Sequence, residues 1–476
     1  MKRTSHSVSA IPSSRSMWPL AIAAAFSLSA PLAAHAMDFE WRLKATAAGV
    51  ADSGRDLGLN DASDTREAYV DVTPWMHVQF SPDWAGFVRV RGYAPTGRLL
   101  QPGDDDNNES ATKKAFVGLK EAWIEYGGLT SYPGETLRIG RQRIRNDDTQ
   151  FFDEDIDAAR WIFDTTLLQA DLGVAHQFDT YRTDNIDLPQ EQDHRTYAFG
   201  SLAYDWRAHQ RVGMRVVYAG DDNHLPDAGE PVDTSKRLTK SKQAWINVYF
   251  DDHPYDWRDQ QAVSYWLQGT YLTGSRDSVS YDPVTGLVTT SNDGANVDAW
   301  EGEGGLRAKL NQNVQAGVAV AHSGGGGKAQ YEQTGTQSNY SRFTGTRSQI
   351  YRFNDAFRPE LGNLQAATAF VSASGGQWDG SVVYNKLRRP DDRAPVVSDA
   401  LSVTPSVRDH DLGQGVDVVV TRYFDLSGAG GATAYTPDDT GDSSVRLRAS
   451  WFDPGKAYGS DAKNEYRILM EFTLWY

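Results

Sequence analysis

The 476-residue sequence contains no cysteine and few positive charges. Without cysteine, neither a disulfide framework nor a thiolate metal site can form. With 47 Lys and Arg against 63 Asp and Glu, the chain has no basic surplus, which argues against nucleic acid as a ligand. After residue 36 there is also no run of about 18 apolar residues, so no transmembrane helix is expected.

Signatures of catalysis and of cofactor binding are missing as well. The sequence has no His-Glu-x-x-His and no Gly-x-Ser-x-Gly pattern. The glycine-rich stretch Gly324–Lys328 is followed by Ala329 where a phosphate loop needs Ser or Thr. Residues Asp104–Glu109 offer oxygen ligands for calcium but lack EF-hand spacing. We expect no enzyme and no cofactor, with a solvated acidic loop at 104–109 and a loop-bound calcium ion as the alternative.

The first 36 residues have the pattern of a cleavable secretory signal. Lys2, Arg3 and Arg15 precede a short apolar stretch that begins at Trp18 and ends at Ala34-His35-Ala36. A membrane anchor is the alternative, but the stretch is short and rich in Ala, Ser and Pro. We expect cleavage after Ala36, which makes residues 1–36 the signal and residues 37–476 one exported domain.

The last eleven residues alternate between two kinds of side chain. One face carries Tyr466, Ile468, Met470, Phe472, Leu474 and Tyr476, and the other carries Arg467, Leu469, Glu471, Thr473 and Trp475. A period of two predicts a β-strand, and an apolar face bounded by aromatic residues suits a strand that contacts lipid. The terminal aromatic residue also resembles the C-terminal assembly signal of outer-membrane proteins.

The same alternation recurs in residues 70–80, 86–91 and 444–451, with arginine repeatedly on the polar face. A soluble barrel buries its inner face and would not place arginine there, so the pattern predicts a water-filled lumen. About eighteen such segments of roughly ten residues follow one another, as tilted spanning strands require. The predicted fold is all-β: a single-chain transmembrane antiparallel β-barrel in the outer membrane of a Gram-negative cell. A soluble β-sandwich is the alternative for any single strand.

An even number of strands places both termini in the periplasm, with short turns on that side and long loops outside. Short turns are predicted at 81–83, 206–208 and 311–313. Long extracellular connections are predicted at about 94–113, 179–193, 220–241, 275–294, 323–362 and 389–412. Residues 425–442 form a long connection where a periplasmic turn is expected. A plug or gate at the periplasmic mouth is the functional interpretation, and a floppy turn is the alternative.

Several stretches resemble the alginate export porins of the outer membrane, in the same order along nearly the whole chain. They are Arg55–Gly58, Tyr132–Arg145, Trp161–Leu168, Tyr181–Asp184, Leu272–Asp277, Ser323–Lys328, Phe343–Ser348, Arg352–Phe353, Ala356–Arg358, Asn363–Thr368, Asp411–Gln414 and Pro454–Gly459. The resemblance implies an 18-stranded monomeric barrel with a narrow electropositive constriction. It also implies an extracellular lid loop, a periplasmic plug loop, and periplasmic components of an alginate export complex as partners.

The resemblance, carried over position by position, implies a constriction formed by Lys44, Lys120, Glu121, Arg143, Asp153, Asp184, Arg446 and Glu471. Alternation alone places Arg446 and Glu471 on the inward face. Glu121 shares a face with Trp123 and Glu125, so Lys120 has the wrong parity and requires a bulge or a strand end.

Arg143 shares its face with Arg141 but also with the apolar Ile139. The sequence also departs from the family pattern, because Thr73, Tyr340 and Gln349 stand where the family has arginine. Arg342 and Arg347 lie close to the last two in sequence and could compensate for them.

The favoured function is passive export of an anionic polysaccharide, alginate or a close polyuronate. Each uronate has one carboxylate, which an arginine guanidinium binds bidentately at any relevant pH. The alternatives are an anion-selective uptake porin for acidic oligosaccharides or other small anions, and an outer-membrane hydrolase. The long connection at 425–442 favours export over free diffusion, and the missing catalytic signatures argue against the hydrolase.

Overall fold

The computed structural model describes residues 38–60, 64–96, 115–184, 186–190, 192–233, 237–325, 330–424, 426 and 441–476. In them, eighteen strands form one sheet. The strands are β1 (Asp38–Ser53), β2 (Thr65–Ser81), β3 (Trp84–Pro95), β4 (Phe116–Tyr126), β5 (Glu135–Arg145), β6 (Asp153–Asp164), β7 (Leu168–His176), β8 (Arg195–Arg207), β9 (Gln210–Asp221), β10 (Thr239–Asp251), β11 (Val263–Tyr281), β12 (Val288–Lys309), β13 (Val314–Ser323), β16 (Gln365–Gly375), β17 (Trp378–Arg388), β18 (Asp411–Phe424), β19 (Ser443–Pro454) and β20 (Glu465–Trp475). A separate ribbon consists of β14 (Tyr340–Ser341) and β15 (Ile350–Tyr351), and a short 3-10 helix η1 covers Lys456–Tyr458.

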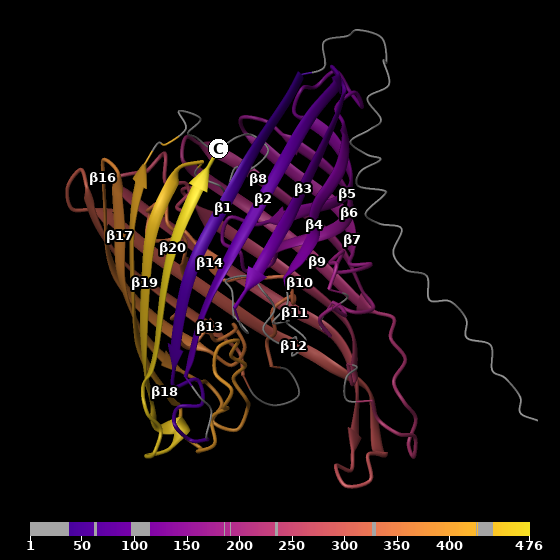
Figure 1. The fold of residues 1–476 in the computed structure, drawn as a ribbon. Helices are drawn as coiled ribbons and strands as arrows, with labels where there is room; N and C mark the ends of the chain where they lie inside the picture. The colour runs from indigo at the N-terminus through magenta and orange to yellow at the C-terminus, as the bar shows by residue number, and fades with distance from the viewer. Residues whose placement is uncertain are drawn as a thin grey trace, which may run out of the picture. The chain divides into compact units, whose positions relative to one another are not determined.

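The sheet closes on itself. Neighbouring strands pair antiparallel in chain order, and β20 pairs with β1 from Trp475 opposite Lys44 to Tyr466 opposite Ser53. The predicted barrel of about eighteen strands is therefore confirmed. Figure 1 shows that β1 begins and the chain ends at one end of the barrel. We name this the terminal end and the opposite one the loop end.

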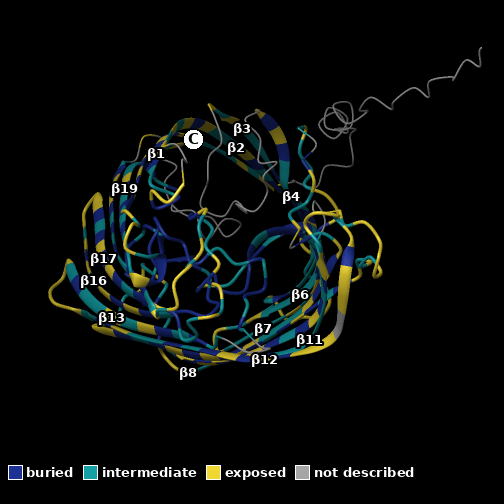
Figure 2. Ribbon diagram, turned by 90° about the horizontal axis from the view of Figure 1, so that it is seen from below, coloured by how far each residue is buried: buried dark blue, intermediate teal, exposed yellow. Residues whose placement is uncertain are grey.

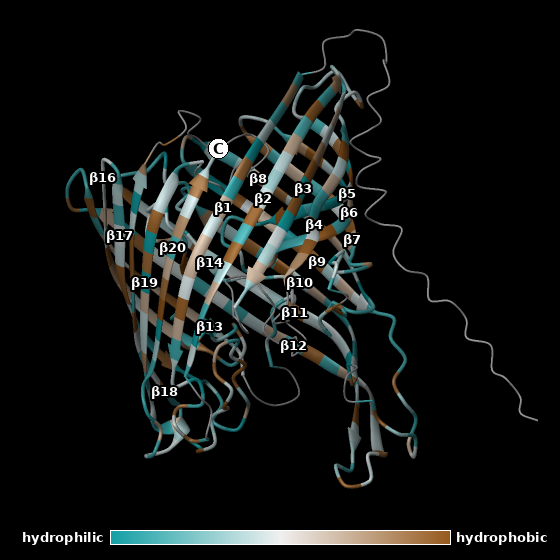
Figure 3. Ribbon diagram, in the orientation of Figure 1, coloured by the Kyte–Doolittle hydropathy of each residue, from teal (hydrophilic) through white to brown (hydrophobic). Residues whose placement is uncertain are grey.

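The two faces of the wall differ as the alternation predicts. On β20, Ile468 and Met470 point outward and are 51% and 58% exposed, whereas Arg467 and Leu469 point inward and are buried. Large apolar side chains are exposed along most of the strands, and Figure 3 shows apolar and polar residues interspersed along them. An outer face of this kind suits the hydrocarbon of a bilayer. Among the described residues, no helix is long and apolar enough to cross a membrane.

Aromatic residues gather at the ends of the outer wall. Towards the terminal end, Trp84 and Tyr126 lie with ring centroids 4.7 Å apart, and Trp41 and Tyr476 with centroids 5.6 Å apart. Trp300, further towards the loop end, is 55% exposed and packs on the ring of His322. Such belts are typical of the two membrane interfaces.

Connections follow the predicted alternation of short turns and long loops with two exceptions. The short turns at 81–83, 206–208 and 311–313 are confirmed. The predicted long connection at 275–294 is wrong, because β11 and β12 continue as a paired hairpin beyond the wall and turn only at residues 282–287. Residues 252–262 form a longer connection at the terminal end than we expected. The predicted signal, the acidic stretch 104–109 and most of 425–442 lie outside the described residues.

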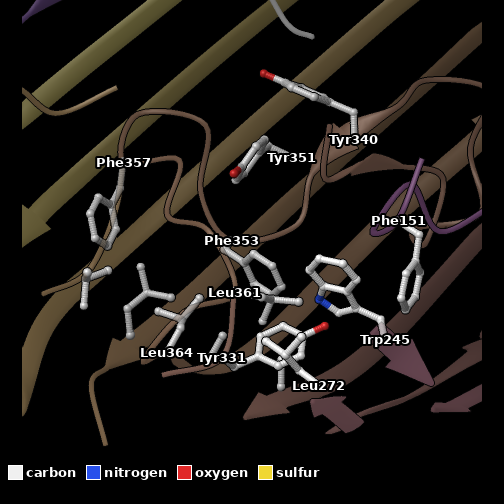
Figure 4. Packing of buried hydrophobic residues seen from close by; sticks show 14 of the residues in the cluster. Phe151, Trp245, Leu272, Tyr331, Tyr340, Tyr351, Phe353, Phe357, Leu361 and Leu364 are labelled. Atoms are coloured by element: carbon white, nitrogen blue, oxygen red, sulfur yellow. The ribbon is translucent and has the colours of Figure 1, made fainter. Parts of the chain in front are cut away.

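The connection between β13 and β16 lies inside the barrel. We call its described residues 330–364 the inner loop; the length of this connection was predicted, but not its path. Figure 2 shows buried chain within the ring of strands. In the inner loop, Tyr331, Phe353, Leu361 and Leu364 are at most 3% exposed, and they belong to one cluster with inward residues of the wall such as Trp245 (Figure 4). The inner loop therefore packs against the inner wall, and this packing positions the charged residues described next.

Candidate functional site in the lumen

A second connection also enters the barrel. We call residues 146–152, between β5 and β6, the crossing turn. The backbone N–H of Asp153 donates to the carbonyl of Thr336 in the inner loop at 2.7 Å. Further into the turn, Phe152 packs on Tyr197 of β8, and Gln150 Nε2 donates to Glu303 Oε2 of β12 at 2.5 Å. The crossing turn thus contacts inner faces of strands that do not neighbour β5 or β6.

The β5–β6 hairpin leaves the wall at Gly140. Pairing of β4 with β5 ends where Ala122 lies opposite Arg141. Gly140 has φ of 125°, and a Cβ there would lie 2.3 Å from the carbonyl oxygen of Ala122, so only glycine fits. Ile139 remains on the outer wall, 49% exposed, while Arg141 is buried. The prediction that Ile139 and Arg143 share an inner face is wrong, because the bend separates them.

Four predicted residues come together in what we call the β4–β6 cluster. Glu121 Oε1 lies 3.2 Å from Arg89 Nε, and Glu121 Oε2 accepts from the backbone N–H of Arg143 at 3.1 Å. The Arg143 guanidinium binds Asp153, and Lys120 Nζ lies 3.0 Å from Asp155 Oδ2. The cluster also includes Arg89 and Asp155, which our site prediction left out although alternation had placed Arg89 on the inner face. It combines three cations with three carboxylates.

Lys120 reaches this cluster through a bulge. Arg89 of β3 lies opposite Glu121, and the next residue, Val90, lies opposite Leu119, so Lys120 has no opposite residue on β3. An extra residue of this kind changes the parity of a strand. The expectation that Lys120 requires a bulge or a strand end is confirmed.

Three other predicted residues lie where β20 closes the barrel against β1. Arg446 Nη1 and Arg448 Nε lie 3.6 and 3.7 Å from the same oxygen of Glu471. The ammonium group of Lys44 lies 5.4 Å from the ring centroid of Trp475. We call Arg446, Arg448 and Glu471 the β19–β20 cluster. Arg448 was not among the predicted site residues, although alternation gave it the same inward face as Arg446.

Asp184 lies apart from both clusters. It belongs to the connection between β7 and β8, where its carboxylate binds Arg182 at 2.8 Å. The Arg182 guanidinium lies 3.5 Å from the ring centroid of Phe116 on the inner face of β4, and Arg182 forms a bridge with Gly118. Asp184 therefore holds Arg182 against the inner face of β4, near the loop end of the barrel.

Neutral residues replace the family arginine at two positions of the inner loop and at one of the wall. Tyr340 lies between two guanidiniums, with Arg448 and Arg358 carbon atoms 5.4 and 5.8 Å from its ring centroid. With the Gln349 amide oriented so that its oxygen faces Arg145, this oxygen accepts a hydrogen bond from the Arg145 guanidinium at 2.7 Å. Positive charge therefore lies beside both of these residues. Thr73 stands on β2, where its hydroxyl donates to Asp71 at 3.1 Å.

Arg342 and Arg347, which could compensate by sequence proximity, have other contacts. Arg342 Nε donates to the carbonyl of Arg347, and Arg347 binds towards the terminal end, where its guanidinium lies 3.7 Å from the ring centroid of Tyr423 and 3.4 Å from Asp442. The guanidiniums that lie beside Tyr340 and Gln349 belong to Arg145, Arg358 and Arg448, which sequence proximity could not reveal.

A buried carboxylate fixes the arginines around Tyr340. Asp355 accepts from the Tyr340 hydroxyl and lies 2.9 Å from Arg358 Nε. Burial raises the pKa of Asp355, but Arg358, Arg467 and Arg448 outweigh it and hold that pKa well below its ordinary value. Asp355 is therefore a permanent anion at neutral pH, so the arginines around it keep a fixed geometry.

Among the residues that the structure describes, no group of three or more His, Asp or Glu side chains is arranged to hold a metal ion. The arrangement can instead bind and release carboxylates, because partly exposed cations on the inner wall, such as Lys120, Arg143 and Arg446, alternate with carboxylates.

Comparison with known proteins agrees with this geometry. A model of the family described as alginate export matches residues 37–468. The alginate production protein AlgE of Pseudomonas aeruginosa is 36% identical over 442 residues, covering 90% of each chain. The protein of the same name from Pseudomonas syringae pv. tomato is 34% identical over 474 residues, covering 92% of this chain and 93% of that one. The crystal structure of Acinetobacter baumannii OccAB4 has a similar fold, with a TM-score of 0.54 at 10% identity over 92% of this chain and 98% of that one.

Proposed function

Because the chain belongs to the alginate export family, we propose that it is a channel of the Gram-negative outer membrane through which alginate or a close polyuronate leaves the cell. The closed eighteen-stranded barrel with an apolar outer face provides the pore. The polymer passes the β4–β6 and β19–β20 clusters, and Lys44, Lys120, Glu121, Arg143, Asp153, Asp184, Arg446 and Glu471 line or shape its path.

One observation carries this proposal: the cations of the inner wall are paired yet still accessible. The side chains of Lys120, Arg143 and Arg446 are 27%, 29% and 23% exposed although each contacts a carboxylate. A uronate carboxylate can therefore share such a cation without displacing it. Exchange of this kind keeps each contact weak, and a polymer that passes a channel must leave each site as readily as it enters.

Channel recordings test the proposal. The purified protein in a planar bilayer should conduct anions in preference to cations, because the accessible charge at both clusters is positive. Oligomannuronate should block the chloride current, and a neutral oligosaccharide of equal length should not. Cation preference contradicts the proposal. Anion preference without block by oligomannuronate favours the uptake of small anions.

The proposal extends to the remaining properties of the channel. We propose a monomer without enzymatic activity and without a cofactor, since the described cations of the inner wall are held in ion pairs with carboxylates. Cleavage after Ala36, delivery of the polymer by periplasmic components and, as the alternative to a solvated loop, calcium binding by residues 104–109 are part of the proposal. N-terminal sequencing of the mature protein tests the first of these.

A further inference from the structure

Two ion pairs attach the crossing turn to β9, and the one formed by Asp148 is buried. Asp148 Oδ2 lies 2.5 Å from Arg215 Nη1 on β9, and both side chains are at most 8% exposed. Asp147 lies 3.2 Å from Arg211 on the same strand, and Arg211 also lies 3.1 Å from Asp251 of β10. Strand β9 neighbours β8 and β10, not β5 or β6. These contacts therefore join strands that are not neighbours in the wall.

The two arginines are themselves held in place by an aromatic ring. Tyr249 of β10 lies opposite Gly213 of β9, and Gly213 is midway in sequence between Arg211 and Arg215. A Cβ at Gly213 would lie 2.2 Å from the ring, so the glycine leaves the space that Tyr249 occupies. The ring centroid is 4.3 Å from the Arg215 guanidinium carbon and 5.4 Å from that of Arg211. Stacking on the ring and binding to carboxylates together fix both guanidiniums.

A third attachment joins the crossing turn to the inner loop. The Gln150 amide donates to Glu303 and accepts from Gln268 Nε2 at 2.6 Å. Glu303 also binds Arg352 of the inner loop. The crossing turn, the inner loop and the wall formed by β9 to β12 are thus one connected unit.

Buried ion pairs contribute little net stability, because desolvation offsets their attraction. Their effect on geometry is larger, since a buried charge that loses its partner is strongly unfavourable. Arg143 and Asp153 stand near the ends of the two strands that the crossing turn joins. Contacts that hold the crossing turn in place therefore also hold Arg143 and Asp153 beside Glu121.

We propose that Arg211 and Arg215 are positioning residues of the channel: they hold the crossing turn inside the lumen and so set the width of the passage at the β4–β6 cluster. The role of that cluster in passage rests on the proposed function. The positioning itself concerns only the geometry of the lumen, and it can be measured with small ions alone.

The test is the single-channel conductance in potassium chloride of Arg215→Gln, compared with Arg215→Lys and with Arg160→Gln. Arg160 forms an ion pair of the same kind with Asp171, at 2.6 Å, but within the wall between β6 and β7. The Gln variant should conduct roughly twofold more than the wild type or better, because the narrowest section governs ion flow. Arg215→Lys keeps the charge, so its conductance should be close to that of the wild type. Arg160→Gln should leave the conductance unchanged.

Two results would overturn the proposal. One is wild-type conductance in an Arg215→Gln barrel whose folding is confirmed by its heat-modifiable mobility in gels. The other is an equal rise in Arg160→Gln. If Arg215→Gln does not fold, Asp148→Asn replaces it, since the amide keeps the shape but removes the charge, and unchanged conductance there overturns the proposal as well. Absence of block by oligomannuronate in the wild type would contradict the proposed function but leave this comparison valid.

Discussion

Arg446 and Glu471 lie opposite each other on β19 and β20, with Arg446 Nη1 3.6 Å from Glu471 Oε2. Arg448 approaches the same oxygen to 3.7 Å. One carboxylate therefore faces two guanidiniums, which leaves the cluster with a positive charge. This surplus on a partly exposed inner wall is what a passing carboxylate would meet.

Replacing Arg446 with glutamate should weaken the block by oligomannuronate. A hydrogen bond to a charged group contributes about 1.5–3 kcal/mol, so the apparent affinity should fall by roughly ten- to hundredfold. The blocking constant from bilayer currents measures the change. Arg422→Glu is the control, because Arg422 is exposed on the next strand and stacks near Trp378, away from the lumen. An unchanged constant in Arg446→Glu would remove this residue from the passage.

Restoring the family charge at Thr73 should have the opposite effect. Thr73 is partly exposed on the inner face of β2 and donates to Asp71, so Thr73→Arg adds a cation without emptying a buried contact. The reversal potential in a salt gradient should shift towards stronger anion selectivity, and oligomannuronate should bind more tightly. Thr73→Gln is neutral and of intermediate length, so it should behave as the wild type. An equal shift in both variants would rule out charge as the cause.

Gly140 should tolerate no side chain. Its backbone has positive φ, and a Cβ would lie 2.3 Å from the carbonyl oxygen of Ala122. Gly140→Ala should therefore destabilise the barrel by about 2 kcal/mol or more. Gly286 also has positive φ, but a Cβ there would meet nothing within 4 Å, so Gly286→Ala should cost only about 1 kcal/mol. The temperature at which folded mobility is lost in gels compares them, and equal losses would contradict the bend at Gly140.

Stability should depend on pH through Asp355. Its pKa is depressed in the folded protein, so its contribution is fully present above the ordinary carboxyl value and is lost as pH falls through the lower folded value. Between pH 7 and 5 the unfolding temperature should thus be insensitive to this group, and it should drop below about pH 4. Asp355→Asn should unfold at a lower temperature at pH 7, and its difference from the wild type should shrink in acid. A constant difference would contradict this assignment.

The alternation of side chains determined most of the fold. Side chains in residues 466–476 alternate with a period of two. Their outer face is apolar because it contacts lipid, whereas their inner face contacts the interior of the barrel. This pattern is local, so it could be recognised without knowing any neighbour. It also placed Arg446, Arg448 and Glu471 on the inside before any pairing was known.

Three features depended on contacts between distant parts of the chain. The direction in which the β5–β6 hairpin leaves the wall follows from Gly140 meeting Ala122, and the bulge at Lys120 follows from its register with β3. The charge beside Tyr340 comes from Arg448, which is far away in sequence. None of these contacts has a local signature, because each depends on which strand lies next to which.

The path of the inner loop is the clearest case. The sequence by itself determined that residues 323–362 are a long polar connection in an outer-membrane barrel with an arginine-bearing lumen. Only the tertiary structure decided that this connection lies inside the barrel and packs against its wall. The physical reason is that its polar residues find partners on inward faces of strands far apart in the chain, as Asn354 does with Asp417 and Ser450. A polar segment buried in the barrel finds hydrogen-bond partners there as it would in water. Composition therefore cannot distinguish a connection inside the barrel from one outside it.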